Sequence, residues 1–352
     1  MIALDVMGGD FAPNVTVHGA INAAKQGVPV ALFGDEAQIL SLLATIYPSW
    51  WSLPLTIIHC SEVIEMGEEP TRGVVKKKDA SLIRAIKAVA DGHASAIVSA
   101  GNSGAALVAG TLIIERVSGI HRPALGNFLP TKNGSVFCID LGANADCKPE
   151  FLEQFAIMGH LYVQAFKGIQ NPRIALLSNG AEPYKGSMII KETFSLLERN
   201  TLINFVGNLE PRDLFDGGAD VIVCDGFAGN IMLKTAQGAA QAISFWLKQA
   251  ATKTWYHKML FGLGSGVFKE LKQKTDYASR GGALLLGLQR PLIVAHGCST
   301  AAAIEKAILF AHEMANNQTM NTFNKALAEL IKASRILQIP TEAKSSRMRA
   351  ER

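Results

Sequence analysis

One lysine and one asparagine stand beside glycine-rich runs in this sequence of 352 residues. Lys185 directly precedes Gly186, and Asn230 ends the run DGFAGN, which starts at Asp225 and follows the apolar run VIVC. A strand, a glycine loop and a helix in succession aim backbone N–H groups at an anion. Together with an ammonium group, such loops suit a phosphate-bearing ligand. A βα turn whose glycines only reverse the chain is the alternative interpretation.

Similar loops of glycine, Asn, Asp and Ser follow other apolar runs. Five such loops are more than chain reversal requires, and if they gather at one edge of a sheet they form an anion-binding cleft. None matches a standard nucleotide fingerprint. The residues that we expect to bind the phosphate or the rest of the substrate are Asp5, Gly8, Gly9, Asp10, Gly101, Asn102, Ser103, Gly104, Asp140, Gly142, Asn144, Gly186, Asp225, Gly226 and Gly229.

The elements that position these loops alternate between strands and helices. This order predicts an α/β fold with a mostly parallel sheet covered on both faces. We expect one continuous helix over 74–92, a helix that starts only after Asn230, and a helical hairpin over about 238–277. Residues 1–340 are expected to form a single domain, and the basic tail 341–352 to be disordered.

Composition excludes several classes of protein. The net charge of +4 and the pI of about 8.7 are only mildly basic, and no run of basic and aromatic residues favours nucleic acid. Five cysteines without a CxxC pair indicate reduced thiols in a cytoplasm. We expect no signal peptide, no metal site and no serine nucleophile. We also expect a soluble protein, because SAGNSG interrupts the uncharged run 94–114, the one run long enough for a membrane-spanning helix.

Six motifs, in order, resemble those of the bacterial phosphate acyltransferases, the PlsX family. They are IALDVMGGDFAP, SAGNSGAAL, IDLGAN with DCKPE, the Lys185-Gly186 turn, VCDGFAGNIMLKT, and GGALLLG with HGCST. The resemblance implies transfer of a fatty acyl group from an acyl carrier protein thioester to inorganic phosphate, for phospholipid synthesis, without a cofactor. It also implies a three-layer α/β/α sandwich similar to phosphate acetyltransferase and the isocitrate and isopropylmalate dehydrogenases. Ser178 and Pro183 depart from the family pattern, which favours Glu182 and Lys185 over their neighbours.

This activity gives the candidate catalytic residues distinct roles. Lys185 would neutralise phosphate, and Asn230 would donate to the thioester oxygen as it becomes an oxyanion. His296 would orient phosphate or act as an acid. The alternatives are a surface lysine, a helix-capping asparagine and a structural histidine. Cys147 and Cys224 lie beside loops but are expected to be buried structural thiols.

Two other functions remain open at this point. A dehydrogenase dependent on NAD(P) on a related fold would need an adenine pocket and, usually, acidic metal ligands, and the loops contain no carboxylate cluster. A non-catalytic scaffold that recruits lipid enzymes to the membrane would show no turnover by itself.

The sequence also suggests partners. An acidic carrier protein would meet basic residues, either Arg72, Lys76, Lys77 and Lys78 or the later Lys269, Lys272 and Lys274. In the hairpin, Leu260, Phe261 and Leu263 precede a glycine-rich turn flanked by lysines, a pattern typical of peripheral binding to anionic membranes. We expect a homodimer whose paired hairpin tips contact the membrane, near a membrane glycerol-3-phosphate acyltransferase that uses the product.

Overall fold

The computed structural model describes residues 1–254, 256, 266, 281–316 and 318–337. Within them, eleven strands form one sheet in the order β3-β2-β1-β4-β11-β10-β5-β6-β9-β7-β8. The strands are β1 (Ile2–Asp5), β2 (Val30–Gly34), β3 (Leu55–His59), β4 (Ala96–Ser99), β5 (Ala124–Thr131), β6 (Gly134–Ile139), β7 (Arg173–Leu177), β8 (Asn204–Leu209), β9 (Val221–Val223), β10 (Ala283–Leu286) and β11 (Leu292–Val294).

Helices cover both faces of this sheet. They are α1 (Asn14–Lys25), α2 (Glu36–Ile46), α3 (Pro70–Lys76), α4 (Ser81–Ala90), α5 (Ser103–Ala109), α6 (Pro149–Lys167), α7 (Met188–Arg199), α8 (Gly226–Thr252), α11 (Ala301–Asn316) and α12 (Gln318–Leu337), with the short helices η1 (Trp50–Ser52), η2 (Gly110–Ile114) and η3 (Pro211–Phe215). None of the described helices is long and apolar enough to cross a membrane.

Two hydrophobic cores lie on opposite faces of the sheet because side chains alternate along each strand. In β1, Ile2 and Leu4 enter the core formed with α1, α2, α6, α7, α11 and α12, whereas Ala3 enters the core formed with α3, α4, α5 and the start of α8. Strands buried on both faces explain the nearly continuous apolar runs in the sequence. The structure therefore confirms the predicted three-layer α/β/α sandwich.

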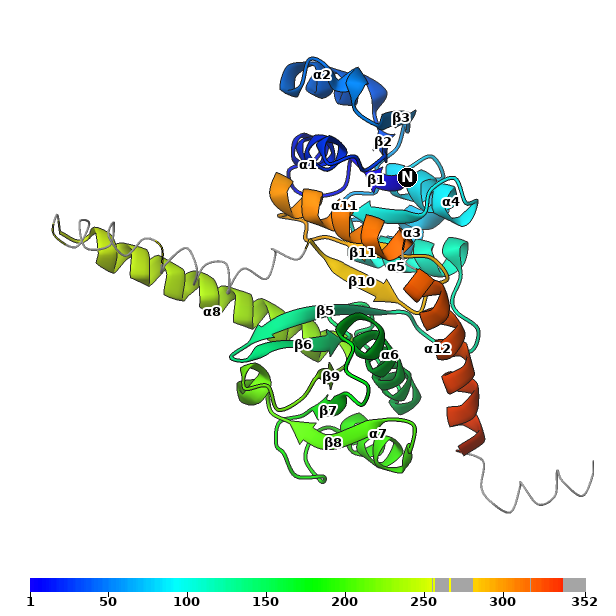
Figure 1. The fold of residues 1–352 in the computed structure, drawn as a ribbon, viewed down its shortest axis with the longest axis vertical. Coiled ribbons are helices and arrows are strands. Elements are labelled where there is room, and N and C mark those ends of the chain that lie inside the picture. Colours follow the sequence, from blue (N-terminus) through cyan, green and yellow to red (C-terminus); the bar gives the residue numbers. More distant parts are fainter. Residues whose placement is uncertain (255, 257–265, 267–280, 317, 338–352) are drawn as a thin grey trace, which may run out of the picture.

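The sheet consists of two parallel groups that run in opposite directions. Seven of the ten described strand pairs are parallel, and three are antiparallel: β11 with β10, β10 with β5, and β5 with β6. Three successive reversals leave β6, β9, β7 and β8 opposite in direction to β3, β2, β1, β4 and β11. The first group occupies the lower part of Figure 1 and the second group its upper part. The carboxyl ends of the two groups consequently lie at opposite edges of the sheet.

The prediction of one helix over 74–92 is wrong, because the chain breaks between α3 and α4. Lys77 turns inward, where its Nζ donates to the Val63 carbonyl at 2.6 Å and to Glu68 at 2.7 Å. Asp79 accepts hydrogen bonds from the backbone N–H and the hydroxyl of Ser61 at 2.8 and 2.7 Å. These contacts with the segment after β3 outweigh the local helical preference.

The long helix α8 begins earlier than expected. Asp225 caps it by accepting from the Ala228 N–H at 2.7 Å, so Gly226 to Asn230 belong to the helix and not to a loop. Figure 1 shows α8 extending away from the body of the fold. Most of the predicted hairpin beyond residue 256, with Leu260, Phe261 and Leu263, and the tail 341–352 lie outside the described residues.

Candidate active site

Lys185 and Asn230 lie at the same edge of the sheet. Strands β6, β9 and β7 are neighbours and run in parallel, so the segments that follow them also lie side by side. Lys185 belongs to the segment between β7 and α7, and Asn230 to the second turn of α8, directly after β9. Asp140, Gly142 and Asn144 come from the segment after β6. Three of the predicted ligand segments therefore meet at one edge.

The buried carboxylate of Asp140 organises the segment after β6. Its side chain is fully buried. It accepts hydrogen bonds from Leu125 N–H at 2.9 Å, Gly142 N–H at 3.2 Å, Ala143 N–H at 3.0 Å, Asn144 N–H at 2.7 Å and Asn144 Nδ2 at 2.9 Å. Burial raises the pKa of Asp140, and the N–H donors act in the opposite direction. Since these donors occupy both oxygens, Asp140 shapes the loop and does not offer its side chain to an anion.

The first turns of α8 pack tightly on this loop. A Cβ at Gly226 would lie 2.7 Å from backbone atoms of Asn144, and a Cβ at Gly229 would clash with the carbonyl oxygen of Asp140. Gly142 has a φ of +131°, and a Cβ there would lie 3.4 Å from the Asn230 side chain. Glycine is therefore required at this helix–loop contact. Because glycine has no side chain, α8 can approach the loop closely, and Asn230 lies against the loop.

Lys185 lies in a turn before α7, which starts at Met188. Its backbone N–H donates to the Glu182 carbonyl at 3.0 Å, and its Nζ lies 5.9 Å from the centroid of the Tyr184 ring. Gly186 has a φ of +96°, and its N–H donates to Asn179 at 2.9 Å. The described residues provide no ion pair for Lys185. The ammonium group is therefore free to meet an anionic ligand.

Two residues around this turn were not identified from the sequence. Asn208 in β8 donates through Nδ2 to the Glu182 carbonyl at 2.9 Å and so supports the Lys185 turn. Ser178, at the end of β7, is buried, and its hydroxyl has no partner among the described groups. The sequence marked Ser178 only as a departure from the family pattern, and no local pattern marks Asn208.

The remaining predicted residues form a second cluster at the opposite edge. Asp5, at the end of β1, is buried and accepts from the hydroxyls of Ser81 at 2.6 Å and Ser99 at 2.7 Å. Burial raises its pKa, against the opposing effect of these hydrogen bonds. A Cβ at Gly8 would lie 2.5 Å from Asp5 and 2.7 Å from the backbone of Gly101. Asp5 thus holds two loops together and does not face a ligand.

Asn102 has a structural role in the same cluster. Its Nδ2 donates to the carbonyls of residues 65, 66 and 68, and its Oδ1 caps α5 by accepting from Ala105 N–H at 3.0 Å. Ser103 and Gly104 form the first turn of α5, where Gly104 packs on α3. The side chain of Asn102 therefore ties the loop after β4 to the segment before α3.

His296 also belongs to the second cluster. It follows β11, is exposed, and its Nδ1 lies 3.1 Å from the Cys298 sulfur. The adjacent Gly297 carbonyl accepts from the Asp10 N–H at 2.9 Å, and Gly9 packs against the same carbonyl. His296 therefore does not share an edge with Lys185 and Asn230. The three predicted catalytic residues are divided between the two clusters.

The thiols near the first edge are poor nucleophiles. Cys147 and Cys224 are both buried, and burial raises the pKa of Cys147 to about 12 and that of Cys224 well above its usual range. Among the described residues no group of three or more His, Cys, Asp or Glu could hold a metal ion.

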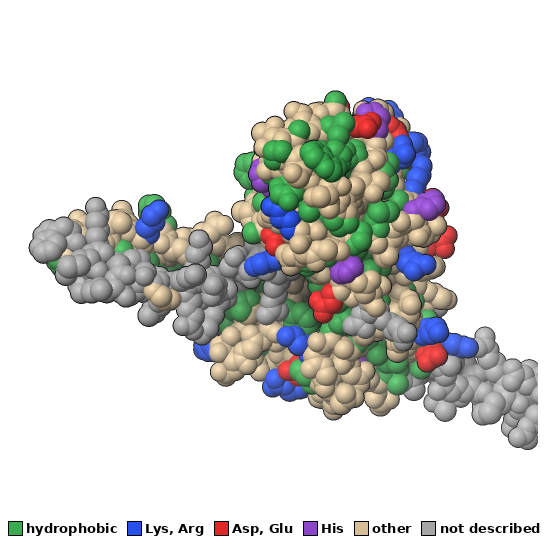
Figure 2. All heavy atoms as spheres, turned by 45° about the horizontal axis from the view of Figure 1, so that its top comes forward, with side chains coloured by type: hydrophobic (Ala, Val, Ile, Leu, Met, Phe, Trp, Pro, Cys, Tyr) green, Lys and Arg blue, Asp and Glu red, His purple; other side chains and the backbone are tan. Residues whose placement is uncertain are grey.

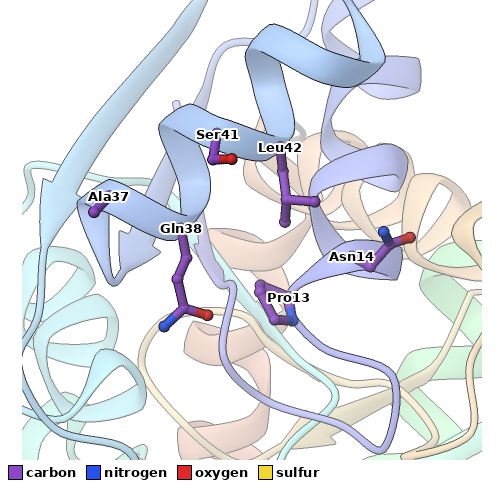
Figure 3. Close-up of a pocket in the computed structure, with 6 residues that line it drawn as sticks. All are labelled: Pro13, Asn14, Ala37, Gln38, Ser41 and Leu42. Carbon is purple, nitrogen blue, oxygen red and sulfur yellow. The ribbon is translucent and has the colours of Figure 1, made fainter.

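A separate pocket lies between the start of α1 and the helix α2. It has a volume of about 470 Å³ and is lined by Pro13, Asn14, Ala37, Gln38, Ser41 and Leu42 (Figure 3). None of these six residues carries a charge, so the pocket is poorly suited to phosphate. It plays no part in the arrangement of Lys185 and Asn230.

Solved structures with a similar fold are phosphotransacetylases. One from Staphylococcus aureus has a TM-score of 0.56 and 16% identity, covering 89% of this chain and 93% of its own. One from Streptococcus pyogenes has a TM-score of 0.56 and 17% identity, covering 90% of this chain and 94% of its own. At these identities the comparison establishes the fold alone.

Sequence relatives define the family. The model of a family described as "Fatty acid synthesis protein" matches residues 1–322. A phosphate acyltransferase of Halalkalibacterium halodurans is 44% identical over 336 residues, covering 95% of this chain and 98% of the relative. One of Geobacillus thermodenitrificans is 44% identical over 329 residues, covering 93% and 98%. The chain belongs to the phosphate acyltransferase family, as its motifs suggested.

The packing of α8 on the Asp140 loop yields a stability prediction. We expect Gly229→Ala to destabilise the fold by about 1–3 kcal/mol. The added methyl group would clash with the backbone carbonyl of Asp140, and it would lie 2.8 Å from the Cys224 sulfur. The matched control is Gly238→Ala in the same helix, where no atom lies within 4 Å. That change should stabilise by about 0.5–1 kcal/mol. Urea unfolding of both variants measures the difference, and equal stability would contradict the described contact.

Proposed function

We propose that the protein transfers a fatty acyl group from the thioester of acyl carrier protein to inorganic phosphate, forming the acyl phosphate used for phospholipid synthesis. Membership of the phosphate acyltransferase family supports the reaction class. The observation that carries the mechanism is the position of Lys185 and Asn230 on neighbouring segments of one sheet edge. The Lys185 ammonium group has no ion pair with a described residue.

The reaction requires no nucleophilic side chain. Phosphate is already ionised at neutral pH, so an oxygen can attack the thioester carbonyl directly. The new C–O bond forms, the C–S bond breaks, and the carrier's thiol leaves as a thiolate. A thiol with a pKa of roughly 8.5 departs with little help from an acid. The buried cysteines fit this route, because none beside the site is accessible to form an acyl-enzyme.

Charge balance and position are then what the enzyme must supply. Lys185 neutralises the phosphate as it approaches the carbonyl. Asn230 donates to the carbonyl oxygen as it becomes negative. The start of α8 adds the partial positive charge of a 27-residue helix close to the same place. His296 remains a candidate acid, but the shared edge favours Lys185 and Asn230 as the core of the mechanism.

We expect Lys185→Ala and Asn230→Ala each to lower kcat for acyl phosphate formation by about 100- to 1000-fold, the typical effect of losing one oxyanion donor. The assay is acyl phosphate formation from acyl carrier protein thioester and phosphate, with circular dichroism to verify folding. Lys234→Ala is the matched control, since this exposed lysine lies one turn beyond Asn230 on α8. Near-normal turnover by folded Asn230→Ala would remove Asn230 from the mechanism.

The carrier protein is proposed to dock on α3. Of the four basic residues in this region, Lys77 is occupied by Glu68 and Val63, whereas Arg72, Lys76 and Lys78 are exposed. Basic and acidic side chains are interspersed over the face shown in Figure 2, which favours a local docking patch over a broad electrostatic surface. The alternative triplet Lys269, Lys272 and Lys274 lies outside the described residues.

Charge reversal tests this surface. Lys76→Glu with Lys78→Glu should raise KM for the carrier thioester and flatten its dependence on salt, because rim charges act mainly on encounter. Lys191→Glu on α7 serves as the matched control, as an exposed lysine on the other half of the sheet. Steady-state kinetics between low and high salt measures the effect. Unchanged KM in the double variant would place the docking site elsewhere.

The protein is also proposed to be a cytoplasmic homodimer that binds membranes peripherally. Ile243, Phe245 and Trp246 on α8 are exposed in the single chain, a surface suited to a second copy. Beyond α8, the sequence Leu260, Phe261 and Leu263 supplies the apolar residues for membrane contact. Such binding would deliver a poorly soluble acyl phosphate to a membrane glycerol-3-phosphate acyltransferase.

Replacing Leu260, Phe261 and Leu263 by Ser should release the protein from anionic liposomes, because the apolar contact with the bilayer is lost. Turnover in solution should be retained. Liposome sedimentation measures binding, and light scattering checks that the mass is unchanged. If the triple variant binds liposomes as strongly as the parent protein does, these residues do not mediate the contact with the membrane.

A further inference from the structure

Five large apolar side chains lie within four residues of Lys185 or Asn230 in the sequence and are exposed to solvent. They are Tyr184, Met188, Ile189, Phe227 and Ile231, and the most exposed are Met188 at 75% and Tyr184 at 68%. Phosphate binding requires none of them. Exposed clusters of large apolar groups usually mark a surface that receives a ligand or a partner.

The five side chains come from the same two segments as the proposed catalytic residues. Tyr184 and Met188 flank Lys185, and the Lys185 ammonium lies 5.9 Å from the centroid of the Tyr184 ring. Phe227 and Ile231 flank Asn230 in the first turns of α8. Because β7 and β9 are adjacent parallel strands, the two pairs come from neighbouring segments at the same edge.

Helical spacing fixes the direction of the α8 pair. Phe227 and Ile231 are four residues apart and so share one face of the helix. Gly226 and Gly229 occupy the opposite side, packed on the loop after β6. The apolar face of α8 is therefore turned away from the loop after β6 and toward solvent.

We propose that these residues form the binding surface for the alkyl chain of the acyl substrate. The inference rests on the proposed function, because the reacting carbonyl must lie within reach of Lys185 and Asn230. The alkyl chain is bonded to that carbonyl, so a long chain extends from it across the neighbouring apolar side chains. Burying each methylene favours binding by roughly fourfold, so this surface selects long chains over short ones.

The alternative occupant is a second copy of the chain. The exposed Trp246 lies farther along α8, about 30 Å from the start of the helix by its rise per residue. It is a matched control, since it is apolar, exposed and on the same helix, yet far from Lys185 and Asn230.

The test compares carrier protein thioesters of hexadecanoyl and butanoyl chains. Phe227→Ala and Met188→Ala should each lower kcat/KM for the hexadecanoyl substrate by about tenfold, equivalent to losing contact with one or two methylenes. For the butanoyl substrate the change should stay within about twofold. Trp246→Ala should leave the ratio of kcat/KM for the hexadecanoyl and butanoyl substrates as it is in the parent protein.

Different failures are distinguishable. An unchanged ratio in both Phe227→Ala and Met188→Ala, with turnover retained, overturns the alkyl-chain surface. A loss of dimer mass in light scattering with an unchanged ratio overturns it in favour of a subunit contact. If the parent protein forms no acyl phosphate from either thioester, the proposed function itself is wrong.

Discussion

The buried carboxylate of Asp140 is the interaction on which the candidate site depends. Five N–H donors converge on its two oxygens, and they come from the loop after β6 and from the start of β5. An unpaired charge at this depth would be costly, so the loop is held in the one conformation that supplies these donors. That loop is the surface on which Gly226 and Gly229 seat α8, and α8 carries Asn230.

The antiparallel strands β5 and β10 decide which functional residues can meet. They reverse the direction of the sheet at its centre, so the carboxyl ends of the two parallel groups point to opposite edges. Asp5 organises one edge through Ser81 and Ser99, much as Asp140 organises the other. The same device, a buried carboxylate at the end of a strand, thus fixes loops at both edges. At the Asp140 edge, Lys185 also has no ion pair among the described residues.

The site combines polar and apolar groups in a way that suits its proposed substrate. A reaction between phosphate and a fatty thioester needs charge neutralisation at one atom and apolar contact along a chain. Under the proposed function, Lys185 and Asn230 supply the first, and the exposed apolar side chains near them in the sequence supply the second. Direct attack by phosphate is consistent with the buried state of Cys147 and Cys224, whose raised pKa values keep them protonated at neutral pH.

The sequence by itself determined the fold class, the family and the local identity of the loops. Apolar runs of strand length and glycine-rich turns are set by local chemistry, so Lys185 and Asn230 could be proposed as site residues from the chain alone. Tertiary structure decided the rest. The break between α3 and α4 depends on Lys77 and Asp79 meeting residues from the distant segment 59–68. The separation of His296 from Lys185 depends on strand direction, which follows from the pairing of strands far apart in sequence and leaves no local pattern.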